Sequence, residues 1–275
     1  MKISNKIVIF IVWGGVGAFI GSLLGYPIGH NPQGIIATFM GVGIWDALIG
    51  IGIGLALALS QNWYLRRINA GYKDIARSTL RCAGAGFAGG IALVSCKIIL
   101  GQSNFATTIA WGFEGLMMGY FIAPVIPNFP QKSALIAGGT SGIIGAILMI
   151  LLSWGLGVQA IISVAIGDSL KGMLLGAMLA FAEALVKEAW LVVHWAPKEE
   201  SIILLGQQPI LIGSSSDCQI YLKKSLGFPP IAATIALIQG QIVLEDKTSG
   251  SQRYLADGNK VQMGNLSIEV RSKKT

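Results

Sequence analysis

The chain has 275 residues and a formal net charge of +7; it is 53% hydrophobic and 12% charged, with a mean hydropathy of +0.66. Soluble domains carry about 25% charged residues, so this composition excludes a protein that is water-soluble along its whole length. Residues 7–65, 82–131 and 133–182 together contain five charged side chains. Each block is long enough for two membrane-spanning helices of about 20 residues, which predicts an integral membrane protein.

We expect six spans in these blocks. They are placed at 7–26, 43–64, 79–100, 105–126, 133–154 and 164–186. The first apolar run is too long for a signal peptide and no A-x-A-like cleavage site follows it, which predicts a retained span. Ten Lys or Arg residues flank the spans on one side, and only Lys97 lies on the other. The positive-inside rule therefore predicts that both termini face the cytoplasm.

A repeated glycine pattern marks the second, fourth and sixth spans. In each, an apolar residue and a variable residue precede two glycines that are four positions apart. The pairs are Gly50 and Gly54, Gly115 and Gly119, and Gly172 and Gly176. Such pairs clear one face of a helix, so that a neighbouring backbone can approach closely. The pattern predicts three helix hairpins in a tight six-helix bundle with pseudo-threefold order.

Four charged residues lie in the same three spans: Asp46, Glu114, Asp168 and Lys171. They are expected in the first turns of their helices, near the outer membrane interface. Asp168 and Lys171 are three residues apart and can pair on one helix. The expectation is that these charges close the bundle by pairing. The alternative is an ion or proton path, which intramembrane charges often mark.

The composition changes in the last part of the chain. Residues 201–275 contain eight Lys or Arg and five Asp or Glu, among short runs of alternating polarity. Strands are expected at 201–205, 210–213, 219–222, 232–238, 241–245, 260–263 and 266–270. Short strands with glycine-containing turns are typical of a β-sandwich. The expected fold is a polytopic α-helical membrane domain at 1–196, a hinge at 197–200 and a small all-β domain at 201–275.

Four segments of this tail, in order, resemble the motifs of a forkhead-associated (FHA) domain. They are 212–220, 229–235, 244–250 and 257–264. The resemblance implies a β-sandwich whose loops face a peptide. The corresponding loop residues here are Ser214, Ser215, Ser216, Pro229, Pro230, Ser249 and Gly250.

The tail departs from the FHA motifs at the positions that recognise phosphothreonine. Ser214 stands where the family has an arginine, Pro229 where it has a serine and Ala232 where it has a histidine. Phosphate binding relies on charged donors, and Pro229 has neither a hydroxyl nor an N–H. The departures favour a degenerate domain used for protein–protein packing, as in the FHA-like domains of bacterial secretion-ring proteins.

The whole arrangement is similar to a group of bacterial multi-pass membrane proteins with glycine-rich helix hairpins, a tryptophan-rich exit segment and a cytoplasmic FHA domain. This resemblance implies a location in the bacterial inner membrane. The exit segment here is 188–191.

These features favour a non-enzymatic scaffold that contacts membrane lipid, binds a cytoplasmic protein through its tail and forms an oligomer or part of a secretion or signalling complex. The alternatives are a channel or transporter with a regulatory tail, and a phosphothreonine-reading adaptor. The chain has two histidines and no recognisable metal, nucleophile or phosphate-loop motif, so no enzyme, cofactor or metal is expected. The basic charge lies where the positive-inside rule places it, so no nucleic-acid partner is expected.

Overall fold

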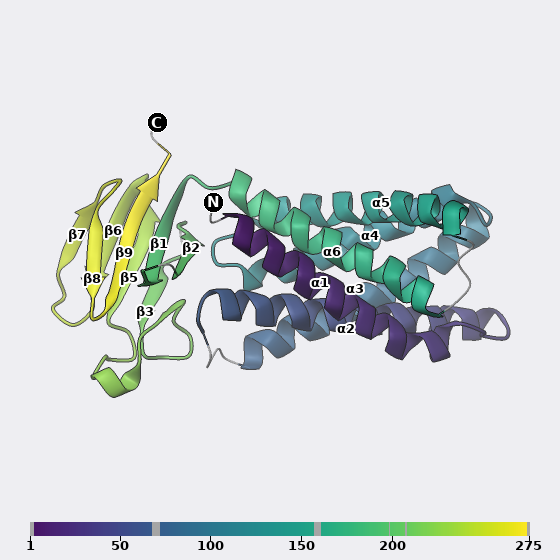
Figure 1. Cartoon of the computed structure of the whole chain (residues 1–275), viewed down its shortest axis with the longest axis horizontal. Coiled ribbons are helices and arrows are strands. Elements are labelled where there is room, and N and C mark those ends of the chain that lie inside the picture. The colour runs from purple at the N-terminus through teal and green to yellow at the C-terminus, as the bar shows by residue number, and fades with distance from the viewer. Residues whose placement is uncertain (1–2, 68–71, 157–160, 198, 207, 274–275) are drawn as a thin grey trace.

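The computed structural model describes residues 3–67, 72–156, 161–197, 199–206 and 208–273. Six long helices precede a β region (Figure 1). The helices are α1 (Ile3–Gly29), α2 (Ile35–Tyr64), α3 (Tyr72–Ile99), α4 (Asn104–Ile122), α5 (Gln131–Leu156) and α6 (Ile161–Leu185), with a 3-10 turn, η1, at Ala123–Val125. Among the described residues, five helices are long and apolar enough to cross a membrane; α4, with 19 residues, is not one of them. The expected order of a helical part followed by strands is confirmed.

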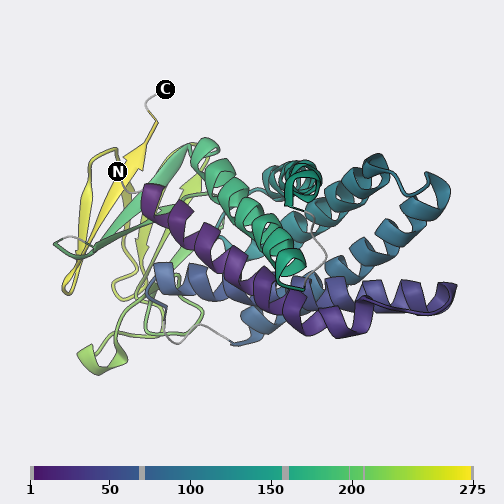
Figure 2. The same ribbon diagram turned by 45° about the vertical axis from the view of Figure 1, so that its right-hand side comes forward.

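The helices form a closed ring. Each one packs against its neighbours in chain order, and α6 packs against α1. Both views show the long axes running roughly along one direction, with the β region at one end only and the start of α1 close to it (Figures 1 and 2). The ends of α2, α4 and α6 and the starts of α3 and α5 therefore face the same end as the β region.

The repeated glycines lie where helices of this ring approach most closely. A Cβ atom added to Gly50 would lie 2.2 Å from the carbonyl oxygen of Cys82 on α3. The same atom on Gly115 would lie 2.2 Å from the Gly138 oxygen on α5, and on Gly172 it would lie 2.2 Å from the Gly14 oxygen on α1. Each even-numbered helix thus packs its glycines against the next helix around the ring. A side chain at these positions would overlap backbone, which cannot rotate away.

The second glycine of each pair lies at a similar contact. An added Cβ would lie 2.7 Å from the Cβ of Cys82 at Gly54, 2.2 Å from the Ala134 oxygen at Gly119 and 2.2 Å from the Phe10 oxygen at Gly176. Because lipid tails are as apolar as the helix surfaces, close van der Waals packing of this kind is what holds membrane helices together.

In the part of the chain that the structure describes, nine strands form the β region. They are β1 (Ala189–Ala196), β2 (Glu199–Leu204), β3 (Ile210–Gly213), β4 (Ile220–Tyr221), β5 (Ala233–Ile238), β6 (Gln241–Asp246), β7 (Gln252–Leu255), β8 (Lys260–Met263) and β9 (Leu266–Ser272). One sheet has the order β2-β1-β9-β8 and the other β4-β3-β5-β6-β7. Apolar side chains from both sheets, such as Leu191, Val193 and Ile235, belong to one buried cluster. The two sheets therefore share a core.

The β region begins earlier than the expected boundary. Strand β1 lies inside the segment assigned to the membrane domain, and it pairs with both β2 and β9. Its side chains alternate between buried and half-buried, as a strand's should. Of the expected hinge at 197–200, Glu199 and Glu200 belong to β2, and Lys198 lies outside the described residues. The boundary prediction was wrong because the first strand was expected at 201–205, whereas Leu191 and Val193 already belong to the core that the two sheets share.

A specific contact joins the end of α2 to β2. The backbone N–H of Ile202 donates to the Tyr64 hydroxyl at 2.8 Å, and the Ser201 hydroxyl donates to the Tyr64 carbonyl at 2.6 Å. Leu65 is completely buried within the apolar cluster of the β region. Arg66 forms an ion pair with Glu199. We call Tyr64, Leu65 and Arg66 with their β2 partners the α2–β2 seam.

Asn128, which follows η1, makes a second contact with the β region. Its side-chain amide donates to the carbonyls of Leu204, at 3.1 Å, and Gln208, at 3.0 Å. The N–H of Gln208 donates back to the Asn128 side-chain oxygen at 3.2 Å. Two separate segments of the helical part therefore hold β2 and the loop after it.

The glycine contacts give a direct test of the packing. Replacing Gly115 or Gly172 with leucine should destabilise the bundle by a few kcal/mol, about the cost of overpacking a core, because the side chain meets backbone 2.2 Å away. Gly84→Leu on α3 is the matched control, since nothing lies within 4 Å of an added Cβ there. The measurement is the thermal unfolding midpoint of the full chain in detergent. Equal midpoints for all three variants would contradict this packing.

Candidate functional site

The loops expected to face a peptide lie together at one end of the strands β3, β5 and β6 in the five-stranded sheet. Ile212 of β3 pairs with Ala233 of β5, which in turn pairs with Asp246 of β6. The end of β3, the start of β5 and the end of β6 are therefore adjacent. The segments that follow or precede these strands carry the seven loop residues expected from the FHA resemblance.

Four of these residues, Ser214, Ser215, Pro229 and Pro230, are hydrogen-bonded into one small unit, and the carbonyl of a fifth, Ser216, accepts from Arg67 at 3.1 Å. The N–H of Ser214 donates to the Pro229 carbonyl and that of Ser215 to the Pro230 carbonyl, both at 3.0 Å. The Ser214 hydroxyl lies 2.9 Å from the Phe228 carbonyl and 3.1 Å from the Pro229 carbonyl. Because this hydroxyl already donates within the protein, it has no proton left for a phosphate oxygen.

The remaining two residues belong to the turn between β6 and β7. The Asp246 carboxylate accepts from the N–H groups of Thr248, at 2.8 Å, and Ser249, at 3.2 Å. These bonds hold the pKa of the exposed Asp246 carboxyl below its ordinary value. Gly250 has a φ of 70°, in the left-handed region that glycine adopts without strain. The N–H of Lys247 donates to the Ala232 carbonyl at 2.9 Å, which ties this turn to the proline segment.

The second candidate site is a buried charge cluster inside the helical ring. The Lys171 ammonium donates to the Glu114 carboxylate at 2.9 Å and lies 4.8 Å from the centre of the Trp111 ring. The Asp168 carboxylate accepts from the Ser22 hydroxyl at 2.6 Å. Asp46 interacts electrostatically with Glu114, Lys171 and Asp168. All four charged side chains are almost completely buried.

The expected position of this cluster was wrong. Glu114 lies ten residues after the first residue of α4 and Lys171 ten residues after that of α6, about 15 Å along each helix. Asp46 lies eleven residues after the start of α2, because α2 begins at Ile35 rather than at residue 43. Asp168 lies seven residues after the first residue of α6, so all four charges are about two turns or more inside their helices instead of in the first turns. The expected Asp168–Lys171 pair is also replaced, since Lys171 bonds Glu114 on another helix.

A glycine makes room for the central carboxylate. A Cβ added to Gly89 on α3 would lie 2.5 Å from the Glu114 Cγ. Three carboxyl groups share the single ammonium of Lys171, and one Glu114 carboxylate oxygen has no hydrogen-bond partner among the described residues. The cluster therefore has two more carboxyl groups than ammonium groups. A bound proton or cation can neutralise this excess of acidic groups.

A second buried ion pair was missed by sequence reasoning. Lys6 of α1 lies 2.5 Å from the Glu183 carboxylate of α6, and both side chains are only 7% exposed. The Lys6 ammonium also lies 5.0 Å from the centre of the Tyr64 ring. From the sequence, Lys6 is expected to be one of the basic residues that flank the membrane spans, with no acidic partner. The signal that identifies the pair is Glu183, an acidic residue just before the end of an apolar span.

Comparisons with known proteins assign no family. No protein-family model and no curated protein matches the chain. Within the part of the chain that the structure describes, no group of three or more His, Cys, Asp or Glu side chains is arranged to hold a metal ion. The functional argument therefore rests on the geometry of the two candidate sites.

The Glu114–Lys171 pair can be tested by a double-mutant cycle. Glu114→Gln or Lys171→Met alone should destabilise the chain by about 3 kcal/mol, because each removes the 2.9 Å hydrogen bond and the nearest opposite charge of a buried group. The double variant should recover a large part of that loss. The measurement is unfolding of the full chain in detergent. Additive effects of the two substitutions would show that the pair contributes no coupling.

Proposed function

We propose that the protein is a non-enzymatic integral membrane scaffold whose FHA-like β region docks a protein in the cytoplasm. The observation that carries the proposal is the α2–β2 seam, which fixes the β region on the end of the helical ring. A domain tied down by a buried leucine, two hydrogen bonds and an ion pair is suited to presenting a surface in a constant orientation.

The proposal includes six spans with both termini in the cytoplasm. α4 packs between α3 and α5 in the ring and carries the same close glycine contacts as α2 and α6. A helix held in that position would cross the membrane with its neighbours. The orientation is supported by Lys6, Arg66 and Arg77, which lie at the end of the ring that carries the β region, whereas Lys97 lies at the last turn of α3, at the opposite end.

The surface we assign to the partner lies along strand β7, at one edge of the five-stranded sheet (Figure 1). Strand β7 pairs with β6 and, among the described residues, with no other strand, so one of its edges can accept an extended segment. Beside it is a groove of about 750 Å³ whose lining includes Leu237, Tyr254 and Lys273. Tyr254 is 72% exposed, and exposed tyrosines are frequent anchors in protein interfaces.

The hydrogen bonds of Ser214 argue against the phosphothreonine-reading alternative. A phosphate needs charge-assisted donors, and the position of the family's arginine is filled by a hydroxyl that bonds two backbone carbonyls. Partner binding should therefore depend on Tyr254 and the β7 edge rather than on a phosphate.

The test is the mass of the full chain extracted from its native membrane in mild detergent. Wild type should run as a complex larger than the 29.0 kDa chain, and Tyr254→Glu should lose the added mass. Thr248→Glu, at another exposed position of the β region, should keep it. Phosphatase treatment should leave the wild-type complex intact. A wild-type monomer would contradict the scaffold, and a complex lost with phosphatase or with Ser214→Ala would instead support phosphothreonine reading.

A second candidate function, a proton- or cation-conducting protein, is favoured by one observation. Asp46, Glu114 and Asp168 share one ammonium group deep in the ring. If the cluster conducts, wild-type proteoliposomes should acidify under a proton gradient, and Glu114→Gln should slow this at least about tenfold, as loss of an essential proton carrier would. Asp74→Asn, at an exposed site, is the control. Equal rates for wild type, both variants and empty vesicles would show that the cluster is structural.

A further inference from the structure

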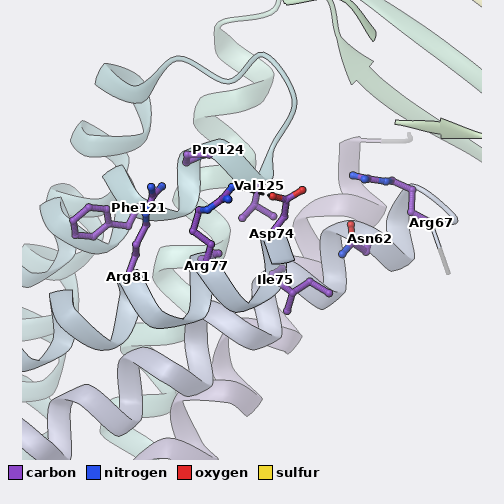
Figure 3. A pocket seen from close by; sticks show the side chains of 11 residues that line it. Asn62, Arg67, Asp74, Ile75, Arg77, Arg81, Phe121, Pro124 and Val125 are labelled. Atoms are coloured by element: carbon purple, nitrogen blue, oxygen red, sulfur yellow. Dashed lines mark hydrogen bonds and ion pairs between the residues drawn. The ribbon is translucent and has the colours of Figure 1, made fainter. Parts of the chain in front are cut away.

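A cavity lined by arginines lies at the end of the ring nearest the β region. Its volume is about 180 Å³, and α2, α3, the end of α4 and η1 form its walls. Figure 3 shows the side chains of Arg77 and Arg81 extending from α3 toward the segment that carries Pro124, with Arg67 at the far side. The remaining lining residues are Ala58, Asn62, Asp74, Ile75, Ser78, Phe121 and Val125.

The cavity has more positive than negative charge. Asp74, the one acidic side chain among the described residues that line it, accepts from Arg77 at 3.2 Å. Arg67 donates to a backbone carbonyl, that of Ser216, at 3.1 Å. In the described residues no ion pair involves Arg81. Among the described residues, two of the three guanidinium groups therefore form no ion pair with a carboxylate.

Two buried polar atoms on the cavity wall also lack partners. The Nε of Arg67 and the hydroxyl oxygen of Ser78 have no hydrogen-bond partner in the part of the chain that the structure describes. The Ser78 residue is 4% exposed. Burial lowers the pKa of the Arg67 guanidinium, and nearby acidic groups oppose this only in part. A buried donor without an acceptor is costly, so an anion placed here would be stabilised.

The shape and depth of the cavity indicate which anion fits. Guanidinium groups match phosphate oxygens in a planar, two-bond geometry. The opposite wall is apolar and is formed by Phe121, Pro124 and Val125, at the end of α4 and in η1. Arg77 lies five residues after the start of α3, about 8 Å along the helix, where a span passes through the headgroup layer.

We infer that this cavity binds a phosphate ester, and specifically the headgroup of an anionic phospholipid in the cytoplasmic leaflet. Arg81 and Arg67 contact the phosphate oxygens, Arg77 adds a third donor beside Asp74, and the acyl chains lie against the apolar wall. Arg67 also holds the Ser216 carbonyl in the loop after β3. A bound lipid therefore lies next to a contact between the ring and the β region.

The test measures lipid binding to the purified full chain at physiological salt, which screens weak surface attraction. Phosphatidylglycerol should bind at least about tenfold more tightly than phosphatidylcholine and raise the unfolding midpoint. Arg77→Gln/Arg81→Gln should abolish this preference. The matched control, Lys224→Gln/Arg253→Gln, removes two exposed charges from the β region and should keep it. Arg67→Lys retains the positive charge but loses the planar guanidinium that can make two parallel bonds to a phosphate. This variant should show a reduced preference for phosphatidylglycerol.

A further measurement distinguishes a lipid headgroup from free phosphate as the ligand of the cavity. Inorganic phosphate alone, at millimolar concentration, should not raise the midpoint of wild type, because it lacks the acyl chains that the apolar wall accommodates. An equal rise with inorganic phosphate that depends on Arg77 and Arg81 would overturn the lipid assignment in favour of a soluble phosphate ligand. No preference between the two lipids, or the same preference in both double variants, would overturn the site itself.

Discussion

The α2–β2 seam is the contact on which the arrangement of the two parts depends. Tyr64 provides two hydrogen-bond acceptors to β2, and Leu65 enters the core that both sheets share. Leaving either partner of such a buried bond unsatisfied costs about 1–3 kcal/mol. The Trp195 indole of β1 also donates to the Ser201 hydroxyl at 2.9 Å. The residue of β2 that bonds the end of α2 is therefore itself held by the adjacent strand.

Inside the helical ring, glycine and buried charge have complementary roles. The glycines bring backbones together around the ring, as at Gly172 and Gly14, and this packing leaves little space for side chains. The charged groups of α2, α4 and α6 share a central region, where Gly89 leaves room for Glu114. The Glu114–Lys171 bond links α4 to α6, two helices that are not neighbours in the chain. Nearer the β region, Lys6 and Glu183 link α1 to α6 in the same way.

The sequence was a good guide to local structure and a poor guide to contacts between distant residues. Apolar blocks predicted the helices because a long uncharged run has few other stable forms, and alternation predicted most strands. Strand β7 was missed because its side chains are exposed apart from the half-buried Leu255 and show no alternation. The Asp168–Lys171 pair was expected from spacing on one helix, but the partner of Lys171 is 57 residues away. Asp46 was placed too near a helix end because the expected span began at residue 43, whereas α2 begins at Ile35, directly after the turn residues 31–34.

The most direct test of this account is whether the β region keeps one orientation on the ring. One spin label is placed at Lys132, near the start of α5, and the other at Thr248, in the turn between β6 and β7. Both positions are exposed, and the distance between them reports how the β region is oriented on the helical ring. Double electron–electron resonance on the full chain in lipid nanodiscs should give one narrow distance distribution. Tyr64→Ala should broaden it by removing the hydroxyl that Ile202 bonds. A broad wild-type distribution, unchanged by Tyr64→Ala, would contradict the fixed orientation on which the proposed scaffold depends.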